Sequence, residues 1–191
     1  MLSLIRTSVS DPIRVDWLPC PGPGAVGLTF APGKQGASFT RSVVHWRDLD
    51  ADLERLRQVE RVDVLVCLLE PHELHRLAIP DYDQATKRHR FQVLRLPLRD
   101  GGVPSSTGPV VALLAKLRAL VAKRKRVAIH CAGGIGRAGV IGGCYLRELG
   151  MGPGQTLAAL RKARGPNCPE TRWQAEYVRA WPRVGGGAHS H

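Results

Sequence analysis

The apolar positions of this chain alternate between short continuous runs and longer helical patterns. The runs are rich in β-branched residues and predict buried strands, because a strand covered on both faces is apolar at consecutive positions. Such strands are expected at Ala25–Phe30, Val62–Leu69, Phe91–Leu98 and Arg126–His130. A further extended segment is expected at Ile13–Leu18, within a stretch rich in Pro and Gly.

Helical patterns fill the intervals between these strands. In the stretch from His45 to about Val59, leucines recur at three-to-four spacing and predict a helix. A helix in two pieces, broken at Pro80, is expected over Glu70–His89. A long helix is expected to be capped by Ser105 or Ser106 and to end at Ala122. The last three expected helices are Gly136–Leu149, which Gly150 ends, Gln155–Arg164 and Glu170–Trp181. Alternating strands and helices predict an α/β fold in which helices flank both faces of a mainly parallel central sheet.

Length and composition predict one folded domain. The chain has 191 residues, of which 43% are hydrophobic and 23% charged, as is typical of a globular protein. We expect a single domain over residues 1–184, with residues 1–24 as a Pro/Gly-rich segment packed on it. The ending GGGAHSH, residues 185–191, is expected to be a disordered tail.

Charge and cysteine content narrow the possible partners. No apolar run reaches the roughly 18 residues of a membrane span. The five cysteines lack the spacing typical of metal sites or disulfides, and this cysteine pattern favours a reducing cytoplasm. The net charge of +12 is concentrated in Lys87–Arg90 and Lys123–Arg126. Without interleaved aromatic residues, these clusters favour a solvated surface that attracts anionic substrates over a nucleic-acid site. We expect no nucleic-acid, membrane or metal partner, and the sequence does not indicate an oligomeric state.

The segment HCAGGIGRAG, residues 130–139, joins a predicted strand to a predicted helix. It contains the pattern G-x-G-x-x-G of dinucleotide-binding turns. Such a turn usually lies in the first βαβ unit and is followed about 20 residues later by an acidic residue. Here the segment lies late in the chain, and the corresponding window, LAALRKARG, has no acid. The dinucleotide interpretation also gives no role to Cys131 or Arg137.

A phosphate-binding loop explains every residue of this segment. Backbone N–H groups between a strand and a helix N-terminus can converge on an anion, and glycines allow its close approach. Arg137 can hold two phosphate oxygens with its planar guanidinium. The helix dipole and Arg137 both favour the thiolate form of Cys131, which makes Cys131 a candidate nucleophile. The loop residues are Ala132, Gly133, Gly134, Ile135, Gly136 and Arg137.

The pattern His130-Cys131-(five residues)-Arg137 resembles the active-site signature of cysteine-dependent protein tyrosine and dual-specificity phosphatases. It is most similar to the kinase-associated phosphatase branch. Further likeness lies in GLTFAPGK (27–34), VDVLVCLLE (62–70), PLRDGGVPS (97–105) and ETRWQAEYV (170–178). The resemblance implies a tyrosine-phosphatase-like fold, a phosphorylated protein or peptide as substrate, a phosphocysteine intermediate and no cofactor. The loop interior carries no lysine for multiply charged inositol phosphates, so single phosphates on protein side chains are expected. Phosphotyrosine is the first expected substrate, with phosphoserine and phosphothreonine as further candidates.

The resemblance also implies individual roles. Cys131 is the expected nucleophile, and Asp100, in an Asp-Gly-Gly loop after a buried strand, is the expected general acid. A simple turn-forming role is the alternative for Asp100. His130 is expected to orient the thiol. Gln174 is expected near the hydrolytic water, although packing on a helix surface explains it as well.

Two cysteine-related features leave alternatives open. The family usually carries Ser or Thr after the signature arginine, whereas this chain has Ala138, so slow phosphocysteine hydrolysis or a phosphoprotein-binding pseudophosphatase is possible. A sulfurtransferase or arsenate reductase could use the same cysteine-arginine loop, but neither needs the acid loop of Asp100. Cys67, at the end of a strand, is either an apolar filler or a redox partner that forms a disulfide with Cys131.

Overall fold

The computed structural model describes residues 4–37 and 42–182. A five-stranded sheet lies at its centre, with strand order β2-β3-β8-β6-β7. The four strands from β3 to β7 are parallel neighbours, and β2 runs antiparallel to β3, so the sheet is mixed. The strands are β2 (Asp16–Trp17), β3 (Ala25–Phe30), β6 (Val64–Cys67), β7 (Gln92–Arg95) and β8 (Arg126–Cys131).

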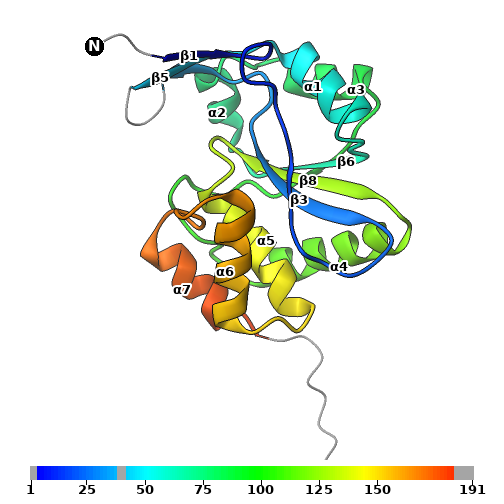
Figure 1. Cartoon of the computed structure of the whole chain (residues 1–191), viewed down its shortest axis with the longest axis vertical. Helices are drawn as coiled ribbons and strands as arrows, with labels where there is room; N and C mark the ends of the chain where they lie inside the picture. The colour runs from blue at the N-terminus through cyan, green and yellow to red at the C-terminus, as the bar shows by residue number, and fades with distance from the viewer. Residues whose placement is uncertain (1–3, 38–41, 183–191) are drawn as a thin grey trace, which may run out of the picture.

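Helices cover both faces of this sheet, as the sequence predicts (Figure 1). On one face lie α1 (Leu49–Gln58), α2 (Pro71–Arg76) and α3 (Tyr82–Arg88). On the other lie α4 (Gly108–Ala122), α5 (Gly136–Glu148), α6 (Pro153–Arg164) and α7 (Arg172–Ala180). The fold is therefore the α/β arrangement expected from the alternation of patterns.

A small second sheet was not predicted. It has the strand order β1-β5-β4, formed by β1 (Leu4–Thr7), β4 (Gln35–Ala37) and β5 (Val43–Trp46). The prediction of helix from His45 is therefore wrong for its first residues, because His45 and Trp46 pair with β1 and β4. Helix α1 begins only after Asp48, whose carboxylate accepts a hydrogen bond from the Ala51 N–H at 2.7 Å.

Other helix ends differ from the sequence patterns by a few residues. Helix α4 begins at Gly108 after Thr107, so neither Ser105 nor Ser106 caps it. Helix α5 ends one residue earlier than expected, and Gly150 follows it with a φ of +93°. A positive φ at this position is typical of a glycine that ends a helix.

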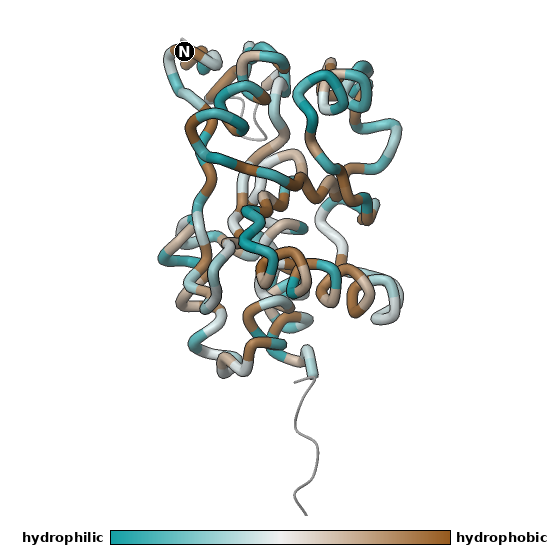
Figure 2. The backbone as a smooth tube through the Cα atoms, turned by 90° about the vertical axis from the view of Figure 1, so that its right-hand side faces the viewer, coloured by the Kyte–Doolittle hydropathy of each residue, from teal (hydrophilic) through white to brown (hydrophobic). Residues whose placement is uncertain are grey.

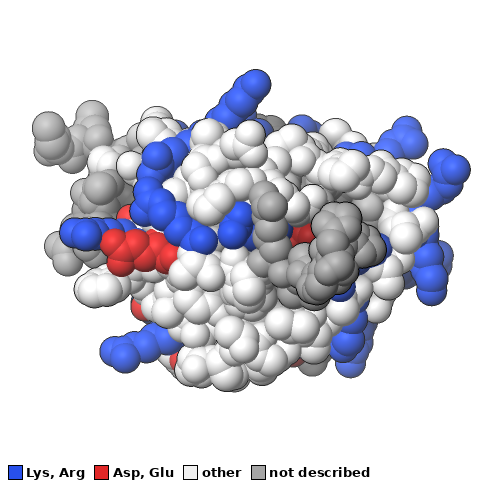
Figure 3. Space-filling model, turned by 90° about the horizontal axis from the view of Figure 1, so that it is seen from below, with Lys and Arg blue, Asp and Glu red and all other residues white. Residues whose placement is uncertain are grey.

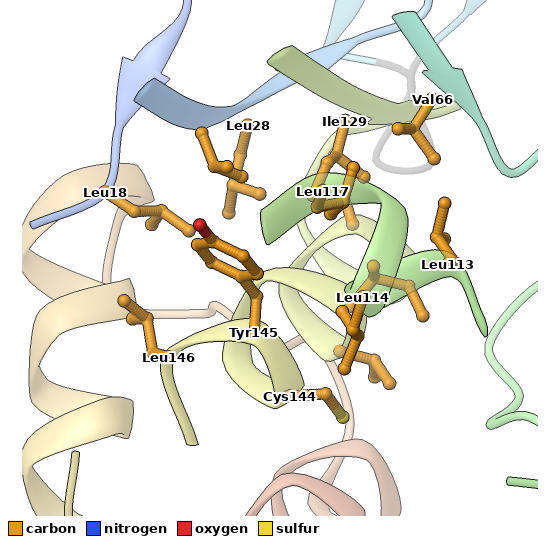
Figure 4. Packing of buried hydrophobic residues seen from close by; sticks show 14 of the residues in the cluster. Leu18, Leu28, Val66, Leu113, Leu114, Leu117, Ile129, Cys144, Tyr145 and Leu146 are labelled. Atoms are coloured by element: carbon orange, nitrogen blue, oxygen red, sulfur yellow. The ribbon is translucent and has the colours of Figure 1, made fainter. Parts of the chain in front are cut away.

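Two hydrophobic clusters hold the helices on the sheet. The larger one lies between the sheet and α4, α5, α6 and α7; Figure 4 shows Leu28, Ile129 and Val66 of the strands facing Leu117 and Tyr145 of the helices. The second packs α1, α2 and α3 on the opposite face, and Figure 2 shows that hydrophobic segments concentrate in the middle of the molecule. Of residues 1–24, the side chains of Ile13, Val15 and Leu18 are buried in these clusters.

The surface and ends complete the fold. Seen from below, much of the face is uncharged; some Lys and Arg side chains project at its rim, and others form a group that extends from the upper left into the middle of the face (Figure 3). Among the described residues, no helix combines the length and the apolar character needed to cross a bilayer. The predicted tail at 185–191 lies outside the described residues, and the domain boundaries remain predictions.

Candidate active site

Cys131 is the last residue of β8, and the glycine-rich loop turns from it into the N-terminus of α5. The Gly134 N–H donates to the Cys131 Sγ at 3.2 Å, so at least one loop amide points to the sulfur. Gly134 has a φ of +70°, and a Cβ there would lie 2.2 Å from the carbonyl oxygen of Thr29. This position therefore requires glycine both for its backbone conformation and for its contact with β3.

The outer side of the loop is held by two cations from distant segments. Arg164, at the end of α6, donates from Nε to the Gly134 carbonyl at 2.9 Å and from Nη2 to the Gly133 carbonyl at 2.8 Å. Lys34, from the segment after β3, donates from Nζ to the Ala132 carbonyl at 3.3 Å. Three successive carbonyls thus face outward. Because C=O and N–H of a trans peptide point in opposite directions, the following amides face the interior of the loop.

Arg137 is fixed by a buried carboxylate. Its Nη1 and Nη2 donate to the two oxygens of Glu73 at 2.5 and 3.0 Å, and Nη1 also donates to the Leu98 carbonyl at 3.0 Å. Burial alone raises the pKa of Glu73, but hydrogen bonds from Arg137 and from the Glu70 backbone outweigh it and leave the pKa below its usual value. The buried Nε of Arg137 has no partner among the described residues. This unpaired donor is available to an anion.

Asp100 lies at the same arginine but in a different environment. Its Oδ1 is 2.9 Å from Arg137 Nη2 and its Oδ2 is 3.6 Å from Arg76 Nη2, while 54% of its side chain remains exposed. Gly101 follows with a φ of +70°, so the chain turns sharply after the carboxylate. The structure therefore brings Asp100 and Arg137 together, and the role of Asp100 as general acid remains a prediction.

Gln174 joins the acid loop to the phosphate loop. Its buried side chain donates from Nε2 to the Gly102 carbonyl at 3.0 Å. A Cβ built on Gly136 would lie 3.0 Å from the Gln174 Oε1, which places this amide against the start of α5. The same oxygen accepts from the Thr171 N–H at 3.2 Å in the cap of α7. Gln174 thus adjoins both loops, and its role with water remains a prediction.

His130 is completely buried behind Cys131. Its Nε2 lies 2.6 Å from the Tyr82 Oη. Burial, then the charge of Arg95, lowers the pKa of His130 to about 3, and burial raises that of Tyr82 well above its usual value. Both groups are therefore neutral near pH 7, and the contact is a hydrogen bond between a neutral imidazole and a neutral phenol. His130 is fixed in one orientation next to the nucleophile.

Cys67 does not face the nucleophile. It pairs in register with His130, and its side chain belongs to the cluster on the α1–α3 face, whereas Cys131 belongs to the cluster on the other face. Burial raises the pKa of Cys67, and Arg95 Nη1 lies 3.6 Å from its sulfur. Both cysteines are free thiols here. A disulfide between them requires the strand ends to rearrange, and this pairing remains a prediction.

Sequence analysis missed four residues that complete the site: Lys34, Glu73, Tyr82 and Arg164. None lies in a motif with Cys131, and each reaches the site through the fold. Glu73 was part of a short polar helix whose sequence indicates only a solvated surface. Arg164 was recognised only as the end of a helix. The described residues contain no cluster of three potential metal ligands, and the expectation that no metal is needed remains a prediction.

Comparison with known proteins connects this geometry to a family. The family model described as "Polymorphic toxin system, DSP-PTPase phosphatase" matches residues 42–151. This segment includes Cys131, Arg137, Asp100 and Glu73, but neither Lys34 nor Arg164. The matched segment therefore contains the inner side of the site, by which we mean Cys131, Arg137 and the two carboxylates that contact Arg137.

Similar proteins cover most of the chain. Cyclin-dependent kinase inhibitor 3 of Rattus norvegicus is 26% identical over 172 residues, which are 87% of this chain and 77% of the relative. A crystal structure of kinase-associated phosphatase, with its catalytic-site cysteine replaced by serine, has a TM-score of 0.76 at 23% identity and covers 87% of this chain and 92% of that one. The active form of Tk-PTP has a TM-score of 0.62 at 26% identity, with coverage of 82% and 90%. The tyrosine-phosphatase-like fold expected from the sequence is confirmed.

Proposed function

This chain belongs to the DSP-PTPase phosphatase family of polymorphic toxin systems, and on that premise we propose that it hydrolyses phosphotyrosine in proteins or peptides through a phosphocysteine intermediate. Phosphoserine and phosphothreonine are proposed as further substrates. The observation that carries the proposal is the buried, unpaired Nε of Arg137 on a loop whose Gly134 amide points to the Cys131 sulfur. These groups match the needs of a phosphoryl group, which has several oxygens and an electrophilic phosphorus.

In the proposed first step, the Cys131 thiolate attacks phosphorus and forms an S–P bond. The bond from phosphorus to the ester oxygen breaks, and that oxygen takes the proton of Asp100. Loop amides and Arg137 hold the non-bridging oxygens while their charge is redistributed. In the second step, water attacks phosphorus and gives a proton to Asp100. The S–P bond breaks, which releases inorganic phosphate and restores the thiolate.

The surroundings of Asp100 support its proposed role. It is the half-exposed carboxylate of the site and lies on a turn beside the arginine, so substrate can displace it from Arg137 while keeping it close to the leaving oxygen. A sulfurtransferase or arsenate reductase has no need of such an acid, and the family membership also favours phosphate esters. We also propose a reducing cytoplasm as the compartment, since all five cysteines are free thiols.

Hydrolysis of p-nitrophenyl phosphate and of a phosphotyrosine peptide tests the function. We expect turnover by the wild type, inhibition by vanadate, and no turnover by Cys131→Ser, whose melting temperature should stay close to that of the wild type. The serine variant should still bind the phosphotyrosine peptide. Binding of the peptide by both proteins without hydrolysis by the wild type would instead identify a pseudophosphatase. A wild type that neither binds nor hydrolyses either phosphate ester contradicts the proposal.

A further inference from the structure

The ammonium group of Lys34 lies against the backbone of the phosphate loop. It donates to the Ala132 carbonyl at 3.3 Å, and the same carbonyl accepts from the Ala31 N–H at 3.4 Å. The ammonium also sits over the Phe30 ring, 4.8 Å from its centroid. Among the described residues, no carboxylate lies within ion-pair distance of it. This lysine ends the segment GLTFAPGK (27–34), which carries part of the family resemblance, but the resemblance implies no role for it. A half-buried, uncompensated cation directly on the loop requires an explanation.

We propose that Lys34 is a positioning residue of the anion loop: its ammonium holds the Ala132 carbonyl outward and so directs the Gly133 N–H at the bound oxyanion. The peptide between these residues is planar, so fixing one end fixes the other. The hydrogen bond also polarises this peptide, which strengthens its N–H as a donor. The expected effect of Lys34 on turnover rests on the proposed function. Its expected effect on oxyanion binding does not depend on that function.

Arg164 holds the carbonyls of Gly133 and Gly134, and its hydrogen bonds to them do not depend on pH. Its Nη1 is paired with the Asp16 carboxylate at 2.7 Å. A guanidinium remains charged over the whole range in which proteins are folded. Lys34 differs in both respects, since it has no carboxylate partner among the described residues and its amine can lose a proton. Of the two outer cations, only Lys34 can therefore act as a switch.

The charges around Lys34 favour its deprotonation at a moderately alkaline pH. Burial, then the charge of Arg164, lowers the pKa of Lys34 to about 8; Arg47 and Arg6 act in the same direction, while Cys131 opposes them. His45 also adjoins this group, but burial and Lys34 lower its own pKa to about 4, so His45 is neutral near pH 8. The loop therefore loses one of its outer charges as the pH rises through about 8.

Bound oxyanion must act back on the lysine. A dianion in the loop favours the charged ammonium, so anion binding raises the fraction of protonated Lys34 above pH 8. By the same linkage, loss of this proton weakens anion binding and lowers turnover. Because removal of one direct oxyanion donor costs about 100-fold or more, we expect about 10-fold for a residue that only positions one.

The test compares the wild type with Lys34→Met, Lys34→Arg and a control, Lys162→Met. Lys162 is exposed on α6, near Arg164 in sequence, and has no contact with the loop carbonyls. Two readouts are followed from pH 6 to 9.5: kcat/KM for p-nitrophenyl phosphate, and stabilisation of the melting temperature by inorganic tungstate. Ratios between proteins at each pH cancel the titration of the substrate.

We expect Lys34→Met to be about 10-fold less active than the wild type at pH 7, and this difference to shrink to less than about twofold above pH 9. The ratio of wild type to Lys34→Arg should fall across pH 8, while Lys162→Met should follow the wild type throughout. A constant ratio for both Lys34 variants would mean a merely structural side chain and would overturn the inference. If Lys34→Met does not fold, the arginine variant alone decides. If no protein hydrolyses phosphate but tungstate binding shows the expected pH pattern, the inference stands and the proposed function fails.

Discussion

Two carboxylates contact the guanidinium of Arg137, and they occupy opposite environments. The Glu73 side chain is 1% exposed and accepts from both terminal nitrogens, whereas Asp100 is 54% exposed and contacts one of them. Glu73 also accepts from the Glu70 N–H within helix α2, while Asp100 lies on a glycine turn. The enclosed carboxylate holds the arginine in place. The exposed one is free to leave and to exchange protons with substrate and water.

Removal of the enclosed carboxylate should have the largest effect. In Glu73→Gln, Arg137 keeps its charge and its contact with the half-exposed Asp100 but loses its buried counter-ion. Removal of one partner of a buried ion pair costs up to about 3–5 kcal/mol of folding free energy. Urea unfolding of the variant measures this loss, and activity should fall with it because the arginine is no longer aligned. Glu176→Gln is the control, since its exposed ion pair with Arg172 contributes little. A loss below about 1 kcal/mol would contradict the fixed role of Glu73.

Removal of the exposed carboxylate should separate activity from stability. In Asp100→Asn we expect kcat to fall about 100-fold, because the leaving oxygen receives no proton, while the free energy of unfolding changes by less than about 0.5 kcal/mol. Phenyl phosphate should suffer more than p-nitrophenyl phosphate, because p-nitrophenolate leaves without protonation more readily. Equal losses on both substrates would indicate that Asp100 only positions Arg137.

The smallest expected effect on kcat concerns Ala138, the uncharged residue that follows Arg137 in the sequence. Ala138 is fully buried in the first turn of α5, where related phosphatases usually carry a hydroxyl. In Ala138→Ser, a hydrogen bond to the sulfur should stabilise the leaving thiolate and raise kcat a few-fold, in line with about 1 kcal/mol per hydrogen bond. Rapid-quench measurements should show a burst of p-nitrophenol in the wild type that shrinks in the variant. Identical bursts and rates would show that phosphocysteine hydrolysis does not limit turnover.

Apart from Glu73, the inner side of the site was predictable because it is local in sequence. Cys131 and Arg137 lie on one strand-loop-helix segment that begins with β8, and the turn of Asp100 follows β7, which is separated from β8 by β6. Because these strands are parallel, the segments that follow them meet at the same edge of the sheet. The same locality made the central strands and most helices recognisable from their hydrophobic periods.

The supporting residues could not be predicted because their roles depend on distant contacts. Glu73 is polar in a short helix, and only the packing of α2 against Arg137 distinguishes it from a solvated glutamate. Lys34 and Arg164 meet the loop through backbone carbonyls, which leave no mark in a sequence pattern. The helix prediction was wrong at His45 and Trp46 for the same reason, because their pairing with the distant strand β1 decides their conformation.

The ion pair of Arg164 with Asp16 has a consequence for how relatives of this protein are compared. Asp16 precedes and Arg164 follows the segment 42–151 that the family model matches. Lys34 and Gln174 also lie outside this segment, one before it and one after it. A truncated protein of those residues would retain the nucleophile and its arginine but not the scaffold that aims the amides. Homologues aligned only over the shared segment can thus have identical chemistry and different anion affinity, and the flanking sequences are where that divergence should be sought.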